Sequence, residues 1–301
     1  MDVALIGVPF NSSGGTAGEA RAPAALRAAG LVDALATWGK ADDAGDVSFA
    51  PPVRARDPAT GIIGASALVE MVTAVRDAVG GALDAGRFPV VVGGECPLLL
   101  GCLAAARDRH GRIGLLFVDG HEDAWPPQRS TTGESADMEL GFATSQAIPT
   151  GMPTLDALLP LVAPEDTAAF GPRNGQEIAG ASVASVAGRV GSFLDAAALR
   201  AAGVVPPIAA ATERFAATTG RWWFHVDLDV LATDSLAAIR YPQPGGLSWH
   251  ELDAGAATAL TVPGALGLDL TIYNPDLDPS GDGGARIVAF VRRLGLRLAG
   301  G

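Results

Sequence analysis

Short apolar runs alternate with longer segments of helical periodicity along the chain. The apolar runs predict buried strands at residues 3–8, 89–92, 113–118, 222–230 and 266–272. Apolar residues at helical spacing predict helices between them, at residues 23–29, 66–85, 98–109 and 195–202. Strands that alternate with helices of this length predict a parallel sheet covered by helices on both faces.

Three details complete this pattern. Ser66 is the expected N-cap of the second helix, which ends at Gly86. Residues 123–156 are rich in proline, glycine, serine and threonine, so we expect a long loop with one short helix, and such loops are often functional. No repeat or change of composition divides the chain, so we expect one domain over residues 1–301.

Composition and charge narrow the class of protein. A hydrophobic content of 49% with 18% charged residues supports a large core and argues against disorder. The net charge of −12 argues against nucleic acid or an anionic membrane as the main partner. We find no signal-like start and no apolar run of the roughly 18 residues that a membrane span needs, so we expect a cytoplasmic protein. Cys96 and Cys102 are too few to indicate a disulfide framework.

Acidic residues gather where two of the predicted strands end. Strand 113–118 is followed by Asp119, His121, Glu122 and Asp123, and strand 222–230 contains Asp227 and Asp229. The carboxyl ends of parallel strands share one edge of the sheet, and alternate residues of extended backbone point the same way. We therefore expect these carboxylates and the imidazole to converge on one place.

Converging buried carboxylates repel one another unless a cation neutralises them. An oxygen-rich set with one imidazole suits Mn²⁺ and related divalent ions. Either motif alone has another explanation: Asp-x-His-x-Asp can be the start of a loop with capping carboxylates, and Asp-x-Asp is very common in proteins. The occurrence of both motifs at the ends of buried-type strands makes a metal site the favoured interpretation.

Five short motifs, in this order, resemble the arginase/agmatinase/formiminoglutamase family, the ureohydrolases. They are IGVPF (6–10), GGEC (93–96), VDGHED (118–123), HVDLDV (225–230) and YNP (273–275). The stretch PQPGGLSWHEL (242–252) is also similar to the family's Pro-Glu-Pro-Gly-Gly-Leu segment. The resemblance implies a three-layer α/β/α sandwich on a mostly parallel sheet of about eight strands, a homo-oligomer, and a centre of two Mn²⁺ ions.

The same resemblance implies a role for each acidic residue. Asp119 and Asp227 would bridge the two metals, Asp123 would bind the first, and His121 and Asp229 would bind the second. A metal-activated hydroxide would then attack the amidine or guanidine carbon of a small substrate.

The chain departs from the family pattern beside these ligands. The family's Gly-Gly-Asp-His gives a histidine to the first metal, whereas this chain has Cys96 there. Cys96 is either a thiolate ligand or a small buried hydrophobe. If Cys96 is not a ligand, only one metal would bind firmly. Divalent ions other than Mn²⁺ are also compatible with these ligands.

A second departure concerns substrate binding. Family guanidine hydrolases carry a glutamate where this chain has Ile272, and that glutamate pairs with the guanidinium. An isoleucine cannot form charge-assisted hydrogen bonds, so we expect a substrate whose reacting end is neutral or held differently. Arg173 and Asn174 lie where the family contacts substrate; Arg173 is either a carboxylate-binding or a structural arginine.

The third departure is a missing proton-shuttling histidine. The matching stretch TTGESADMEL (131–140) offers Glu134, Asp137 or Glu139 as a general acid or base, and the alternative is a solvated acidic loop. Of the other histidines, we expect His110 to complement a helix C-terminus, His250 to lie on the surface or cap a helix, and His225 to pack beneath the site. The residues Trp222, Trp223 and Phe224 are expected in the core.

Three hypotheses for function follow. The leading one is a metal-dependent hydrolase of a linear C–N bond in an amidine, a modified guanidine or a formimino compound. The second is a metal-binding pseudoenzyme or a partner subunit of an active paralogue. A deacetylase-like amide hydrolase is weaker, because the chain lacks the adjacent histidine pair of that class.

Overall fold

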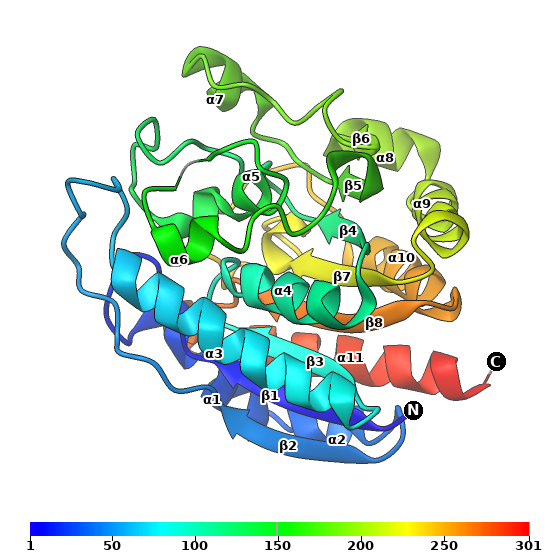
Figure 1. Cartoon of the computed structure of the whole chain (residues 1–301). Coiled ribbons are helices and arrows are strands. Elements are labelled where there is room, and N and C mark those ends of the chain that lie inside the picture. The colour runs from blue at the N-terminus through cyan, green and yellow to red at the C-terminus, as the bar shows by residue number, and fades with distance from the viewer. Residues whose placement is uncertain (149, 301) are drawn as a thin grey trace.

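Eight parallel strands form one sheet with helices on both faces (Figure 1). In this computed structural model, which describes residues 1–148 and 150–300, the strand order is β2-β1-β3-β8-β7-β4-β5-β6. Every neighbouring pair is parallel, so the predicted three-layer α/β/α fold is confirmed. The strands are β1 (Val3–Val8), β2 (Ala41–Asp46), β3 (Phe88–Gly93), β4 (Gly114–Val118), β5 (Thr167–Phe170), β6 (Ser192–Leu194), β7 (Trp222–Asp227) and β8 (Ala265–Thr271).

The helices are divided between the two faces. One face carries α3 (Ala65–Asp84) and α4 (Leu98–His110), which pack against each other, with α5 (Glu139–Ala143) beside α4. The other face carries α1 (Ala22–Ala28), α2 (Leu31–Leu35), α9 (Val205–Thr218), α10 (Trp249–Thr261) and α11 (Asp282–Gly300). Shorter helices are α6 (Pro153–Asp156), α7 (Gly175–Gly180) and α8 (Ala196–Ala202). The 3₁₀ turns are η1 (Gly18–Arg21), η2 (Ser135–Asp137), η3 (Pro164–Asp166), η4 (Leu228–Val230) and η5 (Pro275–Leu277).

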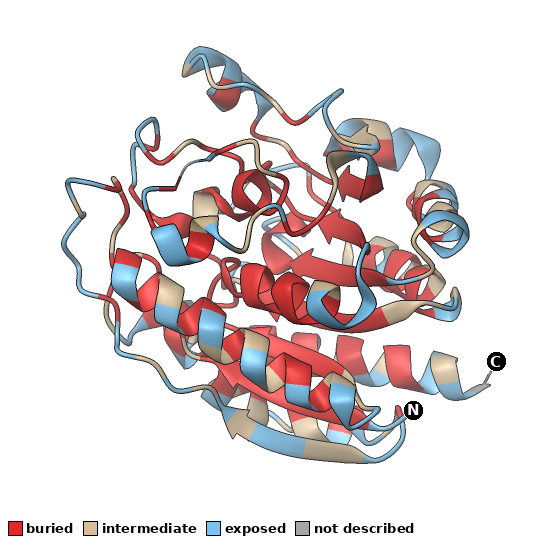
Figure 2. Ribbon diagram, viewed as in Figure 1, coloured by how far each residue is buried: buried red, intermediate tan, exposed pale blue. Residues whose placement is uncertain are grey.

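The central strands read as continuous apolar runs because both of their faces are buried. Along β4, Leu116 and Val118 belong to the core layer under α10 and α11, whereas Leu115 and Phe117 belong to the layer under α3 and α4. Figure 2 shows this buried band through the middle of the sheet. The Trp222–Phe224 cluster is in the core, as expected. No helix among the described residues is both long enough and apolar enough to cross a membrane.

Three strands were not predicted, and each lacks a long apolar run. Edge strand β2 has the sequence ADDAGD, and its residues are half-buried or exposed; Arg27 of α1 pairs with Asp43 and Asp46 of this strand. The other two, β5 and β6, have four and three residues. These three strands form because they pair with a neighbouring strand, and local sequence does not encode that pairing.

Some predicted boundaries were wrong. Helix α3 begins at Ala65 with Gly64 as its N-cap in a left-handed conformation (φ 62°), so Ser66 lies inside the helix. The stretch 123–156 contains α5, α6 and η2 rather than a single short helix. Pro149 of that stretch, and Gly301 at the end of the expected domain, lie outside the described residues.

Candidate metal centre and substrate pocket

The chain turns sharply as soon as β4 ends. The backbone N–H of His121 donates to Asp119 Oδ1 at 2.6 Å, and Asp123 has a positive φ of 39°. The prediction that Asp119, His121 and Asp123 alternate along extended backbone was therefore wrong. This turn, and not strand alternation, brings their side chains together.

A similar turn follows β7. Asp227 is the last strand residue, and its Oδ1 accepts the backbone N–H of Asp229 at 2.6 Å, so residues 228–230 form η4 instead of continuing the strand as predicted. Asp229 Oδ1 in turn accepts the backbone N–H of Gly120 at 2.9 Å. This bond ties the two turns to each other at the carboxyl edge of the sheet.

The two turns and the end of β3 assemble two overlapping sets of side chains. In each set, the potential ligand atoms all lie within 4.8 Å of one another. The first ligand group is Cys96, Asp119, Asp123 and Asp227, and the second ligand group is Asp119, His121 and Asp229. Every predicted metal ligand therefore belongs to a group. Asp119 is the shared member, whereas Asp227 belongs to the first group alone.

Burial and mutual repulsion dominate the electrostatics of these groups. Burial, reinforced by neighbouring carboxylates, raises the pKa of Asp123 and of Asp227 well above the usual range for aspartate. Burial lowers the pKa of His121, but the Asp229 carboxylate, whose Oδ2 is 2.8 Å from His121 Nδ1, outweighs it and raises that pKa to about 9. Burial and repulsion thus disfavour the ionised form of the carboxylates in the first ligand group, and a bound cation would stabilise that form.

Cys96 is fully buried but does not lie in an apolar environment. Its Sγ is 2.7 Å from Asp227 Oδ2 and 3.0 Å from Thr271 Oγ1. Burial, followed by the charge of Asp227, raises the pKa of this thiol well above its usual value. The contact with Asp227 places the sulfur within the first ligand group, and the role of Cys96 as a ligand stays a prediction.

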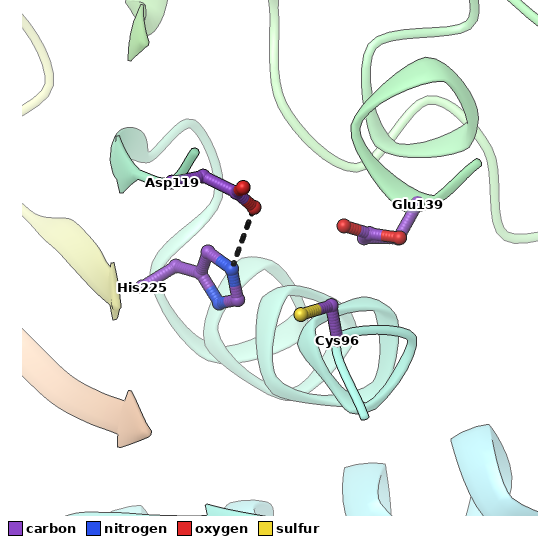
Figure 3. Close-up of side chains that lie close together, drawn as sticks. All are labelled: Cys96, Asp119, Glu139 and His225. Carbon is purple, nitrogen blue, oxygen red and sulfur yellow. Dashed lines mark ion pairs between the residues drawn. The ribbon is translucent and has the colours of Figure 1, made fainter. Parts of the chain in front are cut away.

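His225 joins the sheet to the first ligand group. Its ring stacks on Phe117 at 4.7 Å, as expected of a packing residue. Its Nδ1 also lies 2.5 Å from Asp269 Oδ2, and Asp269 accepts a hydrogen bond from Trp223 Nε1. The other ring nitrogen, Nε2, is 3.7 Å from Asp119 Oδ2 (Figure 3). His225 is thus a packing residue that also supports Asp119 electrostatically.

Several buried polar atoms at this centre have no hydrogen-bond partner among the described residues. They are Asp119 Oδ2, both carboxylate oxygens of Glu139, and His225 Nε2. Unsatisfied buried acceptors of this kind are destabilising unless a cation or proton binds them. The donor set of carboxylates, one imidazole and one thiol therefore fits a divalent metal ion.

A pocket of about 150 Å³ opens above the two ligand groups. Its wall contains Asn174 and Ile272, which were predicted to bind substrate, as well as Glu134 and Asp137, which were predicted to act as acid or base; these roles stay predictions. Most of its charged groups are acidic: Glu19, Glu95, Asp123, Glu134, Asp137, Glu177, Asp227 and Asp229. A lining of this charge suits a substrate that carries a cationic group.

The three candidate acids and bases have different surroundings. Glu134 pairs with Arg240 at 2.9 Å, and burial raises its pKa. Asp137 accepts hydrogen bonds from the hydroxyls of Ser130 and Thr132, both at 2.8 Å, and burial raises its pKa to about 6. Glu139 is fully buried outside the pocket wall, so the solvated-loop alternative is wrong for Glu134 and Glu139.

Arg173 occupies a structural position. Its guanidinium donates to the backbone carbonyls of Asp229 at 2.6 Å and Val230 at 3.1 Å, and it does not line the main pocket. The geometry favours the structural arginine over the carboxylate-binding one. Asn174 Oδ1 accepts the backbone N–H of Glu122 at 3.2 Å, which holds the turn after β4.

A sequence model described as "Arginase family" matches residues 1–294. The chain belongs to the arginase family. It is 22% identical over 306 aligned positions to the arginase of Bacillus subtilis (strain 168), with 97% of both chains covered. It is 25% identical over 174 residues to the arginase of Bacillus caldovelox, covering 57% of this chain and 58% of that one. The chain spans about half the length of the first curated relatives that it matches.

Solved structures agree with this assignment at the level of the fold. The arginase of Bacillus caldovelox has a TM-score of 0.83 at 21% identity, covering 97% of both chains. Proclavaminate amidino hydrolase of Streptomyces clavuligerus has a TM-score of 0.68 at 18% identity, covering 99% of this chain and 92% of that one.

Two charged pocket residues, Glu95 and Arg240, are not among the site residues that the sequence predicts. Glu95 is buried, accepts the backbone N–H of Ser12 and lies 3.8 Å from Arg240, while burial and the charge of Glu19 raise its pKa to about 8. Arg240 joins Glu95 to Glu134 across the pocket. Glu95 could have been noticed beside Cys96 in GGEC, but no local pattern marks Arg240.

Ile272 has an unusual backbone conformation. Its φ of 72° is in the left-handed region, which a β-branched residue rarely adopts, and its N–H donates to Gly94 O at 2.8 Å. This bond joins the ends of β8 and β3 next to the pocket. Strained residues of this kind persist where surrounding structure imposes them, often at functional sites.

Proposed function

We propose that this protein is a metal-dependent hydrolase that cleaves a linear C–N bond in an amidine, a modified guanidine or a formimino compound. The observation that carries the proposal is the convergence of the two ligand groups, with unsatisfied buried atoms, at the base of an acidic pocket. Membership of the arginase family supports it. The expected cytoplasmic location and homo-oligomeric state stay predictions.

The chain's residues would divide the work between binding and proton transfer. The first and second ligand groups would hold one or two divalent ions, Mn²⁺ being the expected one, and a bound ion supplies a water of lowered pKa and polarises the scissile group. Asp137, with its pKa raised to about 6, is suited to move a proton at the pocket wall near neutral pH. Glu134 is held by Arg240, so it is better suited to binding a polar group of the substrate.

The pocket also limits the substrate. An isoleucine at position 272 offers no partner to a guanidinium at the reacting end, whereas the acidic wall suits an amine elsewhere in the molecule. We therefore propose a small substrate with a neutral or weakly basic reacting C–N group and a cationic group remote from it.

Metal-supported turnover by the purified protein tests this function. Chelator-treated protein is expected to be inactive and to regain activity with Mn²⁺ against a panel of amidines, modified guanidines and formimino compounds. Anomalous scattering from a Mn²⁺-loaded crystal would count the ions at Asp119. Bound metal without turnover on any member of the panel would favour the metal-binding pseudoenzyme or partner-subunit hypothesis instead.

Replacing Ile272 by glutamate should shift the substrate preference toward guanidinium compounds. A carboxylate there can form charge-assisted, bidentate hydrogen bonds, so the ratio of kcat/KM for a guanidinium over a neutral substrate is expected to rise at least about tenfold. Ile272→Gln is the matched control, because glutamine has the shape of glutamate without its negative charge. An equal shift in both variants would show that size, and not charge, sets the preference.

A further inference from the structure

Glu139 is a fully buried carboxylate without a hydrogen-bond partner among the described residues. It is the first residue of α5, and both of its side-chain oxygens are unsatisfied. An unpaired buried carboxylate is strongly destabilising, so its environment must provide a cation or a proton. Neither a lysine nor an arginine is found within ion-pair distance of it among the described residues.

The surroundings of Glu139 consist of side chains that bind metals. Its carboxylate, Cys96 Sγ, Asp119 and His225 have ligand atoms that all lie within 4.8 Å of one another. Figure 3 shows the Glu139 carboxylate directed from α5 toward the space between Asp119 and Cys96. Asp119 Oδ2 and His225 Nε2, on the other side of that space, are also unsatisfied. Three side chains thus direct unsatisfied atoms into one small buried region.

This region adjoins the first ligand group, with which it shares Cys96 and Asp119. We propose that Glu139 binds the same divalent cation as the first ligand group. The inference rests on the proposed metal-dependent function and adds to it a ligand from α5, an element that the two aspartate motifs do not contain.

Ligand chemistry explains why an additional carboxylate is useful here. Hard divalent ions such as Mn²⁺ prefer oxygen and nitrogen ligands over sulfur. The position of Cys96 supplies only sulfur, and Glu139 supplies oxygen on the same side of the cluster. His225 Nε2, 3.7 Å from Asp119 Oδ2, is placed to orient Asp119 as an outer-shell donor.

The competing explanation is that Glu139 holds a proton and donates it to a neighbouring carboxylate. Glu139→Gln separates the two, because glutamine keeps the size and an N–H donor but cannot carry the negative charge. The measurement is titration of chelator-treated protein with Mn²⁺, following free Mn²⁺ by electron paramagnetic resonance. Glu213→Gln, an exposed position on α9, is the matched control.

Glu139→Gln is expected to weaken one Mn²⁺ site at least about tenfold, while Glu213→Gln leaves every site at wild-type affinity. Unchanged affinity in Glu139→Gln would overturn the inference while leaving the proposed function intact. Wild-type protein that binds no divalent metal would instead refute both. If Glu139→Gln does not fold, Glu139→Asp decides: reduced affinity supports the inference, and wild-type affinity overturns it.

Discussion

Asp119→Asn is expected to abolish tight metal binding and to lower kcat/KM by about 10³-fold or more. Asp119 is the member that the two ligand groups share, so its loss affects both of them. Loss of metal activation removes several kcal/mol of transition-state stabilisation, and each 1.4 kcal/mol is about tenfold in rate. Metal content measured by mass spectrometry, together with turnover on an active substrate, checks the prediction.

The same substitution should not destabilise the metal-free protein. Asparagine retains the Oδ1 acceptor for the backbone N–H of His121 and removes one negative charge from a buried cluster. The melting temperature without metal is therefore expected to stay the same or rise, whereas the gain on adding Mn²⁺ disappears.

A suitable control is Asp166→Asn. Asp166 is also a buried aspartate, but it lies in η3 just before β5, away from the site, and pairs with Arg112. It should lower stability and leave metal content unchanged. Loss of metal in the control as well would mean that binding responds to general destabilisation and not to Asp119.

The stability of the metal-free protein is expected to fall as the pH rises from about 6.5 to 8. Glu95 has its pKa raised from 4.5 to about 8, so its contribution is complete below pH 4.5 and is lost as the pH rises toward 8. His121 has its pKa raised from 6.5 to about 9, so its contribution is complete below pH 6.5 and is lost as the pH rises through 9. In each case the folded state holds the proton more tightly, and the slope reaches up to about 1.4 kcal/mol per pH unit for each group.

Urea unfolding of chelator-treated protein at several pH values measures this slope. Glu95→Gln should flatten the profile, because it removes one of the groups that titrate in this range, whereas the exposed Glu213→Gln should leave the slope unchanged. Added Mn²⁺ should oppose the trend, since metal affinity rises as ligands lose their protons. Stability that increases over this range in metal-free protein would contradict the assigned protonation of both groups.

Local sequence was sufficient to predict the strands that are buried on both faces, because such strands have continuous apolar runs. The apolar runs of β1, β3, β4, β7 and β8 were predicted within a few residues of their observed bounds. Local sequence did not predict the edge strand β2, which is rich in aspartate, or the short strands β5 and β6. Turn chemistry was also missed, because the side chains of Asp119 and Asp227 accept backbone N–H groups two residues later and stop the extended conformation.

The sequence by itself determined the family, the five apolar strands with several of the helices between them, and the residues that gather at the strand ends, because these depend on apolar periodicity and on motifs of adjacent residues. Only the tertiary structure decided that Cys96 contacts Asp227, that Arg240 joins Glu95 to Glu134, and that Glu139 reaches the first ligand group. These partners are separated by tens of residues or more along the chain, from 20 in the case of Glu139 and Asp119 to 145 in the case of Arg240 and Glu95. Packing of the loops over the carboxyl edge of the sheet brings them together, and no local pattern encodes that approach.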